Sequence, residues 1–176
     1  MEWYHNILSL IDLRSFSNIW YWIALAVLWS SLSHYVMGVP FDMVVRARKR
    51  GGAALEDLET LVRVQVNRRI HIAEVAGPWL VAFSTGGLTM LALLGFAYRI
   101  QFGQALFLLM APGTLVGLMS VAAARRLARA PLEGEALCAF LTRQRLWIQI
   151  LGVVSIFVTA IWGMLQVMTT SVLGGG

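Results

Sequence analysis

The chain has 176 residues, of which 59% are hydrophobic and 13% are charged, and its formal net charge is +5. A soluble domain carries about 25% charged residues, so this composition excludes an ordinary water-soluble fold and favours a single membrane domain. The basic residues flank long apolar stretches instead of lining one face, which argues against nucleic acid as a partner.

The first 17 residues predict a short amphipathic helix that lies on the membrane surface. Apolar side chains recur there at helical spacing among polar ones, at Trp3, Ile7, Leu10 and Ile11. Such a pattern is typical of a helix whose apolar face enters the boundary between headgroups and acyl chains. The run Ser15–Asn18 that follows supplies capping residues for the next helix.

Four apolar segments are long enough to cross about 30 Å of hydrocarbon, which takes roughly 20 helical residues. The predicted spans cover residues 18–38, 72–98, 102–122 and 146–168. Only Arg99–Gln101 separate the second span from the third, so these two helices must be adjacent and antiparallel. Gly77-Pro78 and Pro112 indicate kinks, which neighbouring helices can tolerate in a membrane.

The two long connections, 39–71 and 123–145, are predicted to be helical extensions of the spans. An apolar stripe along Ala53–His71 predicts a helix that runs on into the second span. The other connection is expected to restart as a helix at Pro131, a favoured first helical residue. The fold class is therefore an all-α integral membrane protein, with four spans, an N-terminal amphipathic helix and two helical projections on the cytoplasmic side.

The basic residues predict the orientation of the spans. The two long connections together hold 12 of the 14 basic residues: Arg46, Arg48, Lys49, Arg50, Arg63, Arg68, Arg69, Arg125, Arg126, Arg129, Arg143 and Arg145. Because arginine and lysine are enriched in cytoplasmic loops, both connections are expected to be cytoplasmic and both termini to lie outside.

Ionisable groups near the predicted spans are the first candidates for chemistry, because burying them in a bilayer is costly. His34 and His71 are expected at similar depths, and two facing imidazoles could hold a haem b. The simpler interpretation places both histidines among the lipid headgroups. Glu74 follows His71 by three residues on one helix face and is expected to pair with His71 or Arg68. We expect no cofactor. Two alternatives remain open: a haem b between the two histidines, and a pigment or lipid in contact with Trp29.

Small residues form the strongest pattern inside the predicted spans. Gly113 and Gly117 make a G-x-x-x-G step in the third span, and Ser155, Thr159 and Gly163 continue such a face in the fourth. Faces of this kind let helix backbones approach closely in lipid. We expect these residues to serve packing within the bundle or an interface with a partner helix.

Motifs of catalysis are missing from the sequence. It holds no phosphate-cradling glycine loop, no metalloprotease histidine pair and no serine nucleophile elbow. The single cysteine, Cys138, cannot form a disulfide within the chain, and one cysteine is not enough for a metal site built on cysteines. The chain is therefore predicted to have no catalytic residues and no metal site.

Three stretches resemble a family of small bacterial four-helix inner-membrane proteins of uncharacterised function. They are Ile11–Ala26, Gly38–Asp42 and Val154–Ala160, so the similarity spans most of the chain. Members of this family are often labelled components of the SufBCD complex of iron–sulfur assembly. The resemblance implies a multi-pass protein of the bacterial inner membrane, with periplasmic termini on the orientation above. It supplies no active site, and one cysteine cannot hold an iron–sulfur cluster.

These observations favour a non-catalytic accessory or scaffold subunit of a larger inner-membrane complex. Its expected partners are the lipid bilayer and either other membrane subunits or further copies of itself. An alternative is a small oligomeric transporter or channel, in which Ser30, Thr85, Thr89 and Thr159 would face a shared pore. A haem-b redox subunit that uses His34 and His71 is a third reading.

Overall fold

The computed structural model describes residue 16 and residues 18–173, so the predicted surface helix in residues 1–17 falls almost wholly outside the described part. Helices make up nearly all of the described chain. The elements in chain order are α2 (Ile19–His34), β1 (Tyr35–Val36), β2 (Val39–Pro40), α3 (Phe41–Arg50), α4 (Gly52–Val75), α5 (Gly77–Ala92), the π-helix η2 (Leu93–Ala97), α6 (Gln101–Arg129) and α7 (Gly134–Leu173).

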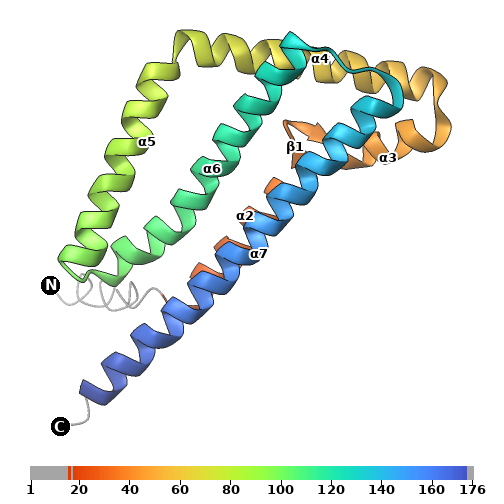
Figure 1. The fold of residues 1–176 in the computed structure, drawn as a ribbon. Helices are drawn as coiled ribbons and strands as arrows, with labels where there is room; N and C mark the ends of the chain where they lie inside the picture. The colour runs from red at the N-terminus through yellow and green to blue at the C-terminus, as the bar shows by residue number, and fades with distance from the viewer. Residues whose placement is uncertain (1–15, 17, 174–176) are drawn as a thin grey trace, which may run out of the picture.

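Three long helices have the length and apolar character to cross a membrane. They are Gly77–Ala97, Gln101–Arg129 and Gly134–Met168, and they overlap the second, third and fourth predicted spans. In Figure 1 α6 rises beside α5 and α7 runs back down, with α2 behind α7. At 16 residues α2 is about 24 Å long, shorter than a usual span, and its crossing of the membrane stays a prediction.

The second predicted span begins later than the sequence analysis expects. The predicted range starts at residue 72, whereas α4 continues to Val75, the chain turns at Ala76, and α5 begins at Gly77. Pro78, in the first turn of α5, lacks a backbone N–H and disfavours helical geometry in the residue before it, so the ladder breaks here. Figure 1 shows α4 lying across the end of the other helices and α5 turning sharply away from it. His71 therefore lies on α4, before the span.

A short β-hairpin replaces the last turn of the first predicted span. The predicted range ends at residue 38, but α2 ends at His34, and β1 then pairs antiparallel with β2. Met37 and Gly38 form the turn with φ of 55° and 81°, the left-handed conformation that a two-residue hairpin requires. Apolar composition alone does not distinguish such a hairpin from a helix end.

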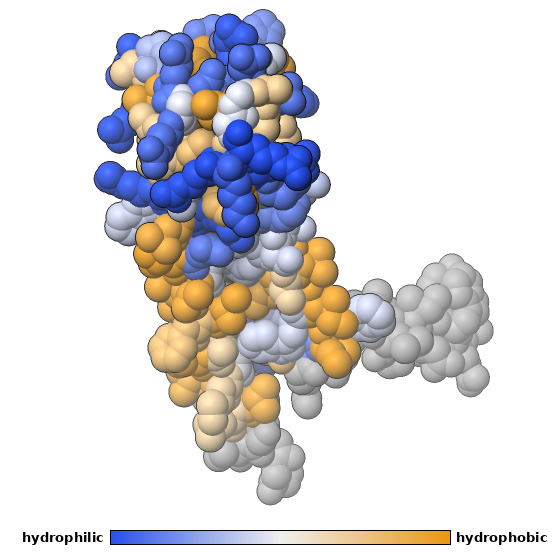
Figure 2. Space-filling view, turned by 90° about the vertical axis from the view of Figure 1, so that its right-hand side faces the viewer, coloured by the Kyte–Doolittle hydropathy of each residue, from blue (hydrophilic) through white to orange (hydrophobic). Residues whose placement is uncertain are grey.

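The two long connections pack together into one body with a shared core. We call this body the headpiece and define it as residues 35–75 and 123–145. Fourteen buried residues make its core: Val36, Met37, Val39, Val44, Ala47, Leu58, Val62, Val66, Ala123, Ala124, Leu127, Leu137, Cys138 and Leu141. Figure 2 shows the hydrophilic residues gathered at this end of the molecule and the hydrophobic ones along the other half.

The helices of the apolar half approach each other closely at glycines. The ring of Trp29 on α2 lies where a Cβ at Gly152 of α7 would come within 2.7 Å of it. Gly95 and Gly103 let η2 approach α6, because a Cβ on Gly95 would lie 2.7 Å from the Gln104 backbone nitrogen. Glycine at these points therefore determines how closely the helices approach.

Candidate functional site in the headpiece

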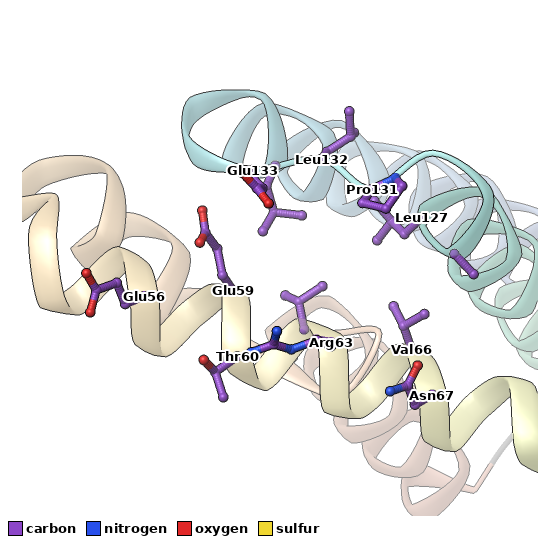
Figure 3. Close-up of a pocket in the computed structure, with 13 residues that line it drawn as sticks. Glu56, Glu59, Thr60, Arg63, Val66, Asn67, Leu127, Pro131, Leu132 and Glu133 are labelled. Carbon is purple, nitrogen blue, oxygen red and sulfur yellow. The ribbon is translucent and has the colours of Figure 1, made fainter.

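The headpiece carries a groove between α4 and the turn that joins α6 to α7, with a volume of about 560 Å³. Figure 3 shows Glu59 on α4 pointing towards the turn on the opposite wall, where Glu133 lies. We call this cavity the headpiece groove. It is lined by Glu56, Glu59, Thr60, Val62, Arg63, Val66, Asn67, Leu127, Ala128, Pro131, Leu132, Glu133 and Leu137.

The headpiece groove combines an apolar floor with an acidic rim. Buried side chains from three helices form the floor, namely Val62, Val66, Leu127 and Leu137. The rim carries the carboxylates Glu56, Glu59 and Glu133 against the single guanidinium of Arg63. Because the rest of the headpiece is rich in arginine, the groove is a local acidic area on a basic body. Such a surface favours a ligand that is both apolar and positively charged.

One rim carboxylate also holds the two walls of the groove together. Glu59 Oε1 on α4 accepts a hydrogen bond of 2.7 Å from the backbone N–H of Gly134, the first residue of α7. A carboxylate at a helix N-terminus is stabilised by the unpaired N–H groups and by the helix dipole. The sequence analysis placed this helix start at Pro131, three residues too early, because a capping group 75 positions away along the chain leaves no local signal.

Two arginines attach the β-hairpin to the helices around it. Arg69 Nε on α4 donates to the Met37 carbonyl at 3.3 Å. Arg145 Nε on α7 donates to the Ser33 carbonyl at 3.2 Å, and its guanidinium lies 3.9 Å from the centroid of the Phe41 ring. Burial lowers the pKa of Arg69, and the neighbouring charge of Arg68 lowers it further. Sequence reasoning counted both Arg69 and Arg145 as orientation signals and missed this structural role.

The predicted histidine and glutamate sites lie on exposed parts of α2 and α4. His34 ends α2 with its ring edge-on to Tyr35, at 4.9 Å between centroids. His71 and Glu74 are exposed on α4. The ion pairs that the structure describes are Arg46–Asp42 and Arg48–Glu135, so Glu74 is not within 4.0 Å of a basic nitrogen of His71 or Arg68. Among the described residues no three His, Cys, Asp or Glu side chains group as a metal site.

The predicted small-residue faces divide into two kinds. On α7, Ser155 and Thr159 are buried, and Gly163 packs against Phe16, so this face is used inside the monomer. On α6, a Cβ at Gly113 or Gly117 would meet nothing within 4 Å. The G-x-x-x-G step therefore faces away from the rest of the described chain.

The hydroxyl groups considered for a pore lie on three different helices, α2, α5 and α7. Thr159 is 0% exposed within the monomer. Thr85 and Thr89 are exposed on α5, and each donates to a carbonyl of its own helix, at 2.7 Å and 2.8 Å respectively. Ser30 is exposed on a different helix, α2. Hydroxyls that bond to their own helix need no aqueous pore to satisfy them.

Comparison of the chain with known protein families, with curated proteins and with solved structures finds no match.

Proposed function

We propose that this chain is a non-catalytic accessory subunit of a larger complex in the bacterial inner membrane, and that it holds a partner subunit through the headpiece groove. The observation that supports this most directly is the groove itself, with its acidic rim over an apolar floor on an otherwise basic body. The occupant is a segment of the partner that presents basic and apolar side chains together. Such a segment would cover the floor and neutralise the rim.

The proposed function includes an orientation of the chain in the membrane, with the headpiece on the cytoplasmic side. The headpiece holds 12 of the 14 basic residues, and the positive-inside tendency favours a cytoplasmic position for it. The partner segment would then be cytoplasmic or lie at the cytoplasmic surface of the membrane. Reporter fusions after Arg50 and after Arg129 test this part independently, since both positions should report a cytoplasmic location. A periplasmic report from either position contradicts the proposed orientation.

Purification of the tagged chain from its native membrane in a mild detergent tests the docking site. We expect a partner at fixed stoichiometry with the unchanged chain, and a loss of about tenfold or more with Glu56→Lys, because a reversed rim charge repels a basic segment. Asp57→Lys is the matched control. It makes the same charge change at the next residue, which is exposed but does not line the groove.

Two results contradict the proposal. Equal partner recovery from Glu56→Lys and Asp57→Lys would remove the groove from the interface. Recovery of the chain only as a homo-oligomer would contradict the accessory-subunit function and favour the oligomeric transporter.

A further inference from the structure

A second, smaller cavity of about 270 Å³ lies where the end of α4 meets the end of α6. It is lined by Ile70, Ala73, Glu74, Arg125, Ala128 and Arg129. Arg125 and Arg129 are four residues apart and so lie on one face of α6, while Glu74 comes from α4. This cavity is separate from the headpiece groove, with which it shares only Ala128.

The three charged side chains of this cavity have no partner in the described part of the chain. Among the described residues, no side-chain hydrogen bond or ion pair includes Glu74, Arg125 or Arg129. The carboxylate and the two guanidinium groups nevertheless line the same space. A ligand that carries both a negative and a positive group would satisfy all three, whereas a simple anion would leave Glu74 unpaired beside it.

The cavity lies at the depth of the lipid headgroups if α5 and α6 cross a bilayer. Glu74 lies in the last turn of α4, three residues before Gly77, where the α5 span begins. Arg125 and Arg129 occupy the last turns of α6, which ends at Arg129. Charged residues at the ends of spans face phosphates and amines of the headgroup layer.

We propose that this cavity binds the headgroup of a phospholipid that carries a phosphate and a primary amine, as in phosphatidylethanolamine. The phosphate accepts hydrogen bonds from Arg125 and Arg129, whose planar guanidinium groups match phosphate oxygens. The ammonium group donates to the Glu74 carboxylate. The cavity has room for about nine water molecules, enough for a phosphate with a short ethanolamine arm. This site goes beyond the proposed function and does not depend on a protein partner.

Native mass spectrometry of the delipidated full chain with defined lipids tests the proposal. We expect phosphatidylethanolamine to be retained about tenfold better than phosphatidylcholine, whose trimethylated nitrogen has no N–H to donate to Glu74. Glu74→Gln should remove this preference while binding of an anionic lipid, phosphatidylglycerol, persists on the arginines. The double variant Arg125→Gln/Arg129→Gln should bind neither phosphatidylethanolamine nor phosphatidylglycerol.

Asp57→Asn and Arg143→Gln are the matched controls, because these exposed residues do not line the cavity. Since the substituted side chains are exposed, all variants should unfold at the temperature of the unchanged chain. Equal retention of phosphatidylethanolamine and phosphatidylcholine by the unchanged chain would overturn the proposal. Unchanged lipid retention in the double arginine variant would also overturn it.

Discussion

The headpiece and the apolar half of the molecule bury their side chains in opposite ways. In the headpiece, Leu58 and Leu141 are 0% exposed and belong to one continuous core, as in a small soluble domain. In the apolar half, only 6% of the most hydrophobic stretch of Gly77–Ala97 is buried, and Phe83 remains 74% exposed. The same chain therefore has one part that excludes water from a core and another whose large side chains point outward.

The difference shows which force stabilises each part. In water, burying a leucine side chain contributes about 1.5–3 kcal/mol, so the headpiece gains stability from its core. In lipid, an outward-facing leucine or phenylalanine is already in an apolar surrounding, and helix association depends on close backbone approach instead. Substitutions should accordingly have large effects in the headpiece and small ones on the lipid-facing surface.

The largest expected effect tests this contrast directly. Leu58→Ala should destabilise the protein by about 2–5 kcal/mol, because it leaves a cavity in the headpiece core. Phe83→Ala removes a larger side chain from the exposed surface of α5 and should change stability by less than about 0.5 kcal/mol. Thermal unfolding of both variants in the same detergent micelles, followed by circular dichroism, provides the measurement. Equal losses of stability would show that the headpiece is not stabilised by a hydrophobic core of the kind found in soluble domains.

A second, smaller effect separates the two kinds of small-residue face. Gly152→Ala should cost about 1–3 kcal/mol, because the added methyl group would overlap the packed ring of Trp29. Gly113→Ala meets open space and should be neutral or stabilising by up to about 1 kcal/mol, the usual gain of alanine over glycine in a helix. Thermal unfolding of the purified protein in mild detergent, which preserves any oligomer, compares the two. A loss of stability in Gly113→Ala would indicate that another chain covers that face.

The smallest expected effect concerns the joint between the two regions. Arg145→Gln removes the guanidinium that bonds Ser33 at the end of α2 and stacks on Phe41 at the start of α3. The cost should be about 1 kcal/mol. Arg143→Gln is the matched control, since Arg143 is exposed two residues away and has no described partner. Protease digestion of the hairpin region should accelerate for Arg145→Gln alone. Equal digestion rates would contradict a joining role for Arg145.

The sequence by itself determined the features that depend on local composition and order. Long apolar runs predicted the three helices that can cross a membrane. Gly77-Pro78 predicted only a kink in one continuous helix, whereas the structure ends α4 at Val75 and starts α5 at Gly77. The short link at Arg99–Gln101 required the adjacent, antiparallel packing of α5 and α6 that the structure shows. These features follow from propensity, length and chain connectivity, which act over a few residues.

Only the tertiary structure decided which segments distant in the chain meet. The sequence could not show that the two long connections share one core, that Glu59 caps the helix starting at Gly134, or that Glu74 lines one cavity with the arginines of α6. Nor could it distinguish Gly113, in open space, from Gly163, packed against Phe16. A periodic pattern establishes which residues share a helix face, but the neighbour that covers this face depends on the packing of the whole chain.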